Sequence, residues 1–376
     1  MQNITNPTNS DSKNALENLS VTDSLIGHAW AAKLLQRSID RGKLSHAYVF
    51  NGPRGVGKTR LAFDFAMAIN CLQPPVQGDG LRYCSECRAC RLIAEDKHSD
   101  VTLINLEWQA REEDVKELTT GGMVLKIDTI RAIQAGISRS PKEINWRMYI
   151  VQDAATMQVA AANAFLKTLE EPPPRAILIL LNDSDRTLLP TIVSRCQLFE
   201  LRAVPYVIIE QALRERGADA SMAQTLAALA AGRPGWAVRA WVEPQRQELL
   251  DDRDEALMHL TELFGADRVR RLAFADEINS RWQGGPEKRL AVFALLNQWL
   301  GWWRDLALTR AGLTKNGYIT NRDKSDELQR QAASLSPLQI KAMLQALTRA
   351  QAELEANVTP RLVLGNLLLN KLPKIV

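Results

Sequence analysis

The sequence lacks long apolar stretches. It contains no run of about 18 apolar residues, and its first residues do not show a charged segment followed by an apolar one. A membrane-spanning helix needs the former, and a secretory signal needs the latter. We therefore expect a cytoplasmic protein without a membrane partner.

The chain also lacks a large excess of positive over negative charge, or the reverse. The formal net charge is +4 over 376 residues, and the sequence pI is about 8.8. Such a mildly basic chain is compatible with a partner near DNA, but the charge alone does not predict DNA binding. Apolar residues make up 46% of the chain, which is enough for a large core, and the length suggests two or three domains.

Cysteine is rare, yet four of the five cysteines fall close together. The cytoplasm keeps thiols reduced, so clustered cysteines indicate metal ligands before disulfides. Two consecutive C-x-x-C steps bring Cys84, Cys87 and Cys90 within reach of one ion. Cys71 is the natural fourth ligand, and His98 is a weaker candidate. Four thiolates leave no open coordination position, so we predict a structural Zn²⁺ site, with free thiols or an iron–sulfur cluster as the alternatives.

The chain does contain a glycine-rich octapeptide, residues 52–59, that fits G-x-x-x-x-G-K-[ST]. An apolar run at 47–50 precedes it, and an amphipathic helical pattern follows it. The glycines let the backbone turn its N–H groups toward an anion, Lys58 can reach the outer phosphates, and the Thr59 hydroxyl can bind Mg²⁺. Phosphate binding does not by itself imply hydrolysis. The predicted nucleotide-binding residues are Gly52, Pro53, Arg54, Gly55, Val56, Gly57, Lys58 and Thr59.

Short apolar runs alternate with helical patterns over the first part of the chain, which predicts an α/β fold with a parallel, doubly wound, five-stranded sheet. In such sheets ligands bind beyond the carboxyl ends of the strands. The phosphate loop, Asp153 and residues 182–184 all follow strands, so we expect one nucleotide site at this edge. The predicted strands are 47–50, 101–104, 148–151, 177–181 and 197–201.

The third strand ends in Gln152-Asp153, where a hydrolysing ATPase of this class places Asp-Glu. Gln152 is neutral and binds a hard cation poorly. Asp153 could polarise the attacking water, although its side chain is one methylene shorter than that of Glu, or it could merely cap a helix that begins near Ala155. Residues 182–184 could contact a γ-phosphate or form a plain turn. The residues alone leave these alternatives open.

The rest of the chain is helical in pattern. Ser336 is expected to cap the helix that follows it, and the tryptophans near residue 300 indicate either a helical core or a subunit interface. The predicted divisions are a disordered polar tail at 1–20, a nucleotide-binding domain at 21–204 with a zinc module at 71–98, a helical domain at 205–250 and a second helical domain at 251–376.

These features resemble the clamp-loader branch of the AAA+ ATPases, and within it the delta-prime subunits of bacterial DNA polymerase III. The resemblance rests on His46-Ala47-Tyr48, the cysteine module, residues 163–173 and Ser194-Arg195-Cys196. It implies that the sheet belongs to an AAA+ domain, that 205–250 is a lid and that 251–376 joins a five-subunit collar. The implied partners are gamma/tau and delta subunits, with the sliding clamp and primer–template DNA reached through the assembly.

The resemblance also implies that Arg195 is an arginine finger acting in trans on a neighbouring ATPase subunit; a local salt bridge is the alternative. Four features favour a delta-prime stator that binds ATP with Mg²⁺ weakly and hydrolyses it poorly. They are Gln152, Gly235 at the place where the motor subunit has a sensing Arg, the sequence at 357–369 and the lack of a long extension. The intact phosphate loop favours a gamma/tau-type motor, with Asp153 as a degenerate Walker B residue. A zinc-dependent interaction module with a vestigial nucleotide site is a third hypothesis.

Overall fold

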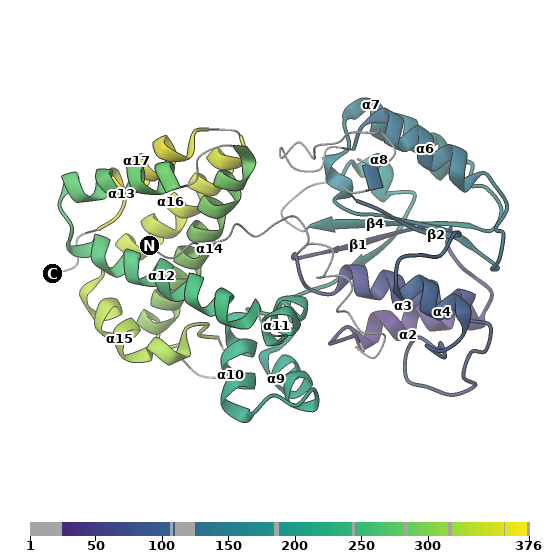
Figure 1. The fold of residues 1–376 in the computed structure, drawn as a ribbon, viewed down its shortest axis with the longest axis horizontal. Coiled ribbons are helices and arrows are strands. Elements are labelled where there is room, and N and C mark those ends of the chain that lie inside the picture. Colours follow the sequence, from purple (N-terminus) through teal and green to yellow (C-terminus); the bar gives the residue numbers. More distant parts are fainter. Residues whose placement is uncertain are drawn as a thin grey trace, which may run out of the picture. The chain divides into compact units, whose positions relative to one another are not determined.

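The computed structural model describes residues 25–105, 108–109, 125–183, 188–242, 245–281, 285–314, 318–356 and 358–373. The chain forms two compact units (Figure 1). The first contains the residues up to Pro205 together with Arg233–Gly235, and the second contains Tyr206–Gly232 and Trp236–Val376. The tail expected at 1–20 lies outside the described residues. The division into lid and collar near residue 250 stays a prediction.

A five-stranded sheet forms the centre of the first unit, in the order β2-β3-β4-β1-β5, and every strand pair is parallel. This confirms the expected doubly wound sheet. The register places Gly52 beside Asp183, and Asn51 between Asn182 and Glu200. The strands are β1 (Ala47–Gly52), β2 (Val101–Ile104), β3 (Arg147–Val151), β4 (Ala176–Asp183) and β5 (Gln197–Glu200).

Helices cover both faces of this sheet (Figure 1), which explains why the strands are apolar on both sides. On one face, Tyr48, Phe50, Phe65 and Phe199 form an aromatic cluster with ring centroids 5.2–6.4 Å apart. This face carries α2 (Ala29–Asp40), α3 (Lys58–Asn70) and α4 (Arg88–Ala94). The other face carries α6 (Ile127–Ile137), α7 (Val159–Glu170) and α8 (Pro190–Val193), with the short 3-10 helix η1 (Ala154–Thr156) after β3.

One buried ion pair, between Asp100 and Arg147, joins the starts of β2 and β3. The carboxylate of Asp100, which is 1% exposed, accepts hydrogen bonds from the backbone N–H groups of Lys142 and Glu143 and from Arg147 Nη2 at 2.5 Å. Burial alone would raise the pKa of Asp100, but these hydrogen bonds together hold it below its ordinary value. Asp100 therefore serves the fold as an ionised group.

We expect Asp100→Ala to destabilise the first unit by about 3–5 kcal/mol, because Arg147 would remain buried without its counter-charge. Hydrogen exchange of the β2 and β3 amides measures this change. The control is Asp128→Ala, which breaks an exposed ion pair with Arg131 and should cost less than about 1 kcal/mol.

The loss at Asp100 should also depend on pH. Because the folded pKa is lowered, the ion pair stabilises the protein above the unfolded pKa of about 3.9, and this stabilisation disappears as the pH falls through the folded value. The variant and the parent protein should therefore converge in acid. An equal difference at pH 7 and in acid would contradict the account.

The second unit is helical throughout its described residues. Its elements are α9 (Tyr206–Glu215), α10 (Ala220–Leu229), α11 (Pro234–Trp241, whose first two residues belong to the first unit), α12 (Gln245–Gly265), α13 (Arg268–Arg281), α14 (Gly285–Arg310), η2 (Arg322–Lys324), α15 (Ser325–Ser334), α16 (Pro337–Glu355) and α17 (Pro360–Asn370). None of the described helices is both long enough and apolar enough to cross a bilayer.

The core of this unit surrounds α14. Trp299, Trp302 and Trp303 are at most 2% exposed, and the first two donate their indole N–H groups at 2.8 Å to the Ala256 carbonyl and to Gln331 Oε1. The tryptophans thus take the first of their two expected roles, that of a helical core. Ser336 caps α16 as expected, since its side chain accepts a hydrogen bond from the Gln339 N–H.

The guanidinium of Arg271, on α13, is one of the buried charged groups of this unit. It is 4% exposed, and burial lowers its pKa. It joins the carboxyl ends of α12 and α17, where carbonyls lack helical partners. Its acceptors are the carbonyls of Leu263, Phe264, Leu368, Leu372 and Pro373.

Candidate functional site

The phosphate loop connects β1 to α3, as its sequence predicts. Gly55 and Gly57 have φ values of 81° and 113°, which side chains with a Cβ rarely adopt. Gly52 has a different reason to be glycine, because a Cβ there would lie 2.2 Å from the Leu201 carbonyl oxygen. All three glycines are therefore required by the local backbone.

Lys58 is folded into the loop rather than extended from it. Its Nζ donates to the carbonyls of Gly52 at 2.6 Å and Pro53 at 3.0 Å, and it forms an ion pair with Asp183 Oδ1 at 2.7 Å. Asp183 is the last residue of β4 and lies beside Gly52 in the sheet. An ammonium group has three donors, so these contacts use all of them.

The other polar residues at this edge hold the strand ends together. Asn182 Nδ2 donates at 2.9 Å to Asn51 Oδ1 and to the Asp183 carbonyl, which ties β4 to β1. Asp153 directly follows Gln152 at the end of β3 and has a φ of 50°. Asp153 stands at the N-cap position of η1, as the capping alternative expected, but its side chain makes no capping hydrogen bond to that helix. A role for Asp153 in hydrolysis stays a prediction.

Two further residues support the loop. His28 is buried, burial lowers its pKa, and its Nε2 lies 3.2 Å from the Val56 carbonyl oxygen. Gly235, at the expected sensor position, donates its N–H to the Gly55 carbonyl at 2.9 Å, and a Cβ there would lie 3.1 Å from the same oxygen. His28 follows Gly27 directly before α2, but the sequence pattern does not predict its contact with Val56.

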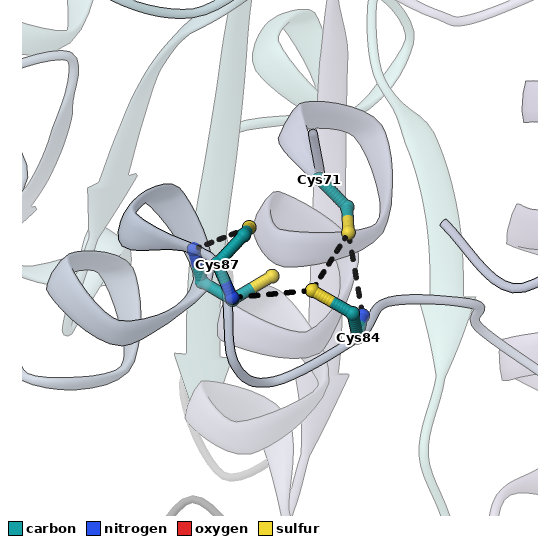
Figure 2. A group of neighbouring side chains, drawn as sticks. Cys71, Cys84 and Cys87 are labelled. Atoms are coloured by element: carbon teal, nitrogen blue, oxygen red, sulfur yellow. Dashed lines mark hydrogen bonds between the residues drawn. The ribbon is translucent and has the colours of Figure 1, made fainter. Parts of the chain in front are cut away.

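The four predicted cysteine ligands come together. The Sγ atoms of Cys71, Cys84, Cys87 and Cys90 all lie within 4.8 Å of one another, and Figure 2 shows the neighbouring thiols of Cys71 and Cys84, which are 3.5 Å apart. A tetrahedral zinc with Zn–S bonds of about 2.3 Å requires sulfur atoms about 3.8 Å apart. The cluster could therefore hold a metal ion of this kind.

Backbone groups support the same cluster. The N–H groups of Cys84 and Cys87 donate to the Sγ atoms of Cys71 and Cys84, each at 3.3 Å (Figure 2). His98 is not part of it, because its Nδ1 accepts a hydrogen bond from the Asp100 N–H at 3.0 Å. The weaker candidate ligand is thus excluded from the cluster, since this ring serves the start of β2.

The helix α3 joins the two sites. It begins at Lys58, and Cys71 immediately follows its last residue. On its side, the buried carboxylate of Asp64 accepts from the Tyr83 hydroxyl at 2.9 Å and pairs with Arg60 Nε at 2.8 Å. Tyr83 precedes Cys84 in the chain. The cysteine module is therefore anchored to the helix that leaves the phosphate loop, a connection that the sequence did not reveal.

Arg195 follows α8, and 37% of its side chain is exposed. Its Nη2 pairs with Glu170 Oε1 at 2.8 Å, and its Nη1 donates to the Thr191 carbonyl at 2.9 Å. Glu170 is the last residue of α7, so two of the motifs that carry the resemblance meet here. The described chain thus contains the local salt bridge, and the role of Arg195 in trans stays a proposal.

A family model described as DNA polymerase III, delta subunit, matches residues 27–205. The tau subunit of DNA polymerase III from Bacillus subtilis (strain 168) is 35% identical over 182 residues, which are 48% of this chain and 29% of that protein. The delta' subunit from the same organism is 33% identical over 195 residues, 52% of this chain and 54% of that protein. A crystal structure of a gamma subunit-related protein from Thermotoga maritima covers 89% of this chain and 97% of that chain, with 19% identity and a TM-score of 0.41.

The chain thus spans about half the length of the delta' relative and less than a third of the tau relative. A TM-score of 0.41 is too low to assign a fold, so the fold is assigned from the strand order and the phosphate loop of the chain itself. The family match falls on the unit that carries that loop, the four cysteines and Ser194-Arg195-Cys196. Over residues 27–205, just under half of its length, the chain is thus similar to the AAA+ clamp-loader family, close to the delta-prime subunits of DNA polymerase III.

Proposed function

We propose that the chain is the delta-prime subunit of a bacterial DNA polymerase III clamp loader, the assembly that places the sliding clamp on primed DNA during replication. In this proposal it acts as a stator. The observation that carries the proposal is the composition of the strand ends: the phosphate loop is intact, whereas β3 is followed by Gln152 in place of a magnesium-binding carboxylate. Such a site retains nucleotide binding without efficient hydrolysis.

The residues of the loop fit an ATP phosphate chain. The backbone at 52–59 supplies N–H groups at the start of α3, Lys58 supplies a cation at the loop, and Thr59 supplies a hydroxyl for Mg²⁺. Bound Mg²⁺ neutralises phosphate charge. We propose weak binding of ATP with Mg²⁺, because Gln152 offers that cation no charge and Lys58 is already engaged by Asp183.

The four cysteines would hold a structural Zn²⁺ ion. Their donor set is four sulfur atoms within 4.8 Å of one another, and four thiolates around one Zn²⁺ would leave no coordination position open for chemistry. Because the cluster is anchored to α3, its ion would stabilise the helix that positions Lys58. We therefore assign zinc a role in the fold of this unit.

Arg195 is proposed to act in trans on a neighbouring gamma/tau subunit. Its exposure supports this, as does its position after a short helix on the surface of the AAA+ unit. The delta subunit, the sliding clamp and primer–template DNA complete the proposed set of partners. Residues 205–250 are proposed as the lid, and 251–376 as the collar that joins these subunits.

One observation favours a second candidate, a gamma/tau-type motor with its own ATPase activity. The glycine geometry and the buried Lys58 of the phosphate loop are complete, and Asp153 stands at the end of β3. In that candidate, Asp153 would act as the water-polarising residue of a degenerate Walker B sequence.

Steady-state ATP hydrolysis by the purified chain separates these candidates. We expect the rate to equal that of Lys58→Ala, because Gln152 leaves the metal poorly held. Turnover that Lys58→Ala abolishes would overturn the stator proposal in favour of the motor. A separate measurement of ATP affinity distinguishes a weak site from a vestigial one.

A further inference from the structure

Asp183 places a carboxylate at the mouth of the phosphate loop. It ends β4, directly beside Gly52, and lies 2.7 Å from Lys58 Nζ. The side chains of Lys58 and Asp183 are 9% and 21% exposed, so solvent and salt screen this pair much less than a surface pair. The ion pair therefore contributes substantially to holding Lys58 in this conformation of the loop.

Any phosphate that reaches Lys58 must replace one of its three acceptors. Two of them are backbone carbonyls, of Gly52 and Pro53, which belong to the loop itself. The third is the carboxylate of Asp183, which is a side chain and can rotate away. The contact with Asp183 is accordingly the one that an entering nucleotide would break.

The net charge of the phosphate chain decides which form of the nucleotide can break the contact between Lys58 and Asp183. Uncomplexed phosphates bring negative charge against the carboxylate of Asp183 as well as toward Lys58. An accompanying divalent cation removes that repulsion, since carboxylate oxygens are favourable neighbours for Mg²⁺. Gln152 supplies no carboxylate at the end of the adjacent strand, so Asp183 is well placed to discriminate.

We propose that Asp183 makes this site selective for metal-complexed nucleotide, by holding Lys58 in the loop and repelling phosphates that arrive without a divalent cation. The inference rests on the nucleotide binding proposed above and deepens it. It assigns Asp183 a specificity role that is separate from hydrolysis and from Arg195.

Equilibrium binding of ATP to the full-length chain, by calorimetry in Mg²⁺ and in EDTA, tests this proposal. Asp183→Asn keeps the shape of the side chain and removes its charge. The matched control is Glu200→Gln, which removes a charge from the end of β5, on the far side of Asn51 from β4. Lys58→Ala serves as the blank, and circular dichroism confirms that each variant is folded.

We expect Asp183→Asn to raise the affinity for ATP in EDTA by at least about tenfold, the effect of removing one close like charge. The ratio of the affinities in Mg²⁺ and in EDTA should fall correspondingly, while Glu200→Gln leaves it unchanged. An unchanged ratio in Asp183→Asn would overturn the proposal, as would equal effects of the two substitutions.

The failure of the proposed function gives a different pattern. If the parent chain binds no ATP in Mg²⁺ or in EDTA but Asp183→Asn does, Asp183 excludes nucleotide with or without the metal, and both the proposed selectivity and the proposed weak binding are wrong. If neither protein binds ATP under either condition, both are wrong.

Discussion

Replacing Cys84 with Ser is expected to abolish binding of the proposed zinc ion and to unfold the segment between α3 and α4. The reason is the small size of this module: a tetrahedral site of four thiolates contributes on the order of 10 kcal/mol to the folding of comparable zinc modules. Because Cys71 directly follows α3, the end of that helix should fray as well. Elemental analysis and hydrogen exchange of the peptides between residues 71 and 94 measure the two effects.

Cys196 provides the matched control. It is the fifth cysteine, it lies outside the cluster, and burial raises the pKa of its thiol to about 12, which makes it a poor metal ligand. We expect Cys196→Ser to keep about one zinc ion per chain and normal protection of the module. A parent protein purified without zinc, with a module that is nevertheless well protected, would contradict the zinc assignment.

The inner strands β1, β3 and β4 could be predicted because each contains a short apolar run that is buried on both faces. Their ends could not. The pattern stopped β1 at residue 50 and β4 at residue 181, whereas both strands continue for two further residues, which pair as Asn51 with Asn182 and Gly52 with Asp183. Polar residues resemble a loop in sequence, but here the sheet satisfies their backbone groups.

This extension is what brings Asp183 to Lys58. The sequence predicted that the loop and residues 182–184 share one edge, and the structure brings the first two of these residues there. The sequence did not predict the ion pair between Lys58 and Asp183, because the partner of Lys58 depends on the register of two strands that are far apart in the chain. The glycine spacing, in contrast, is local and could be interpreted directly.

Other contacts show the same difference between features that local spacing predicts and features that depend on the fold. The four cysteines were recognisable from their spacing, but the pairing of Asp64 with Tyr83 and that of Asp100 with Arg147 join distant segments. Such pairs depend on tertiary packing, and composition alone gives no signal for them. The contact between Glu170 and Arg195 belongs to this class as well.

Arg195→Ala is expected to lower ATP hydrolysis by the assembled clamp loader by roughly a thousandfold at the site that it completes. The guanidinium is the charge that would stabilise phosphoryl transfer on the neighbouring subunit. The rate is measured on a complex in which every other ATPase site is disabled, so that only this site contributes to it.

The most direct test of the stator account compares this ATPase rate for assemblies that contain the parent chain, Arg195→Ala or Arg202→Ala. Arg202 is an exposed arginine of the same unit, so its substitution removes equal charge without touching Glu170 or Thr191. The account predicts full activity with Arg202→Ala and loss of activity with Arg195→Ala, while all three complexes assemble equally. Equal ATPase rates with Arg195→Ala and the parent chain would contradict it.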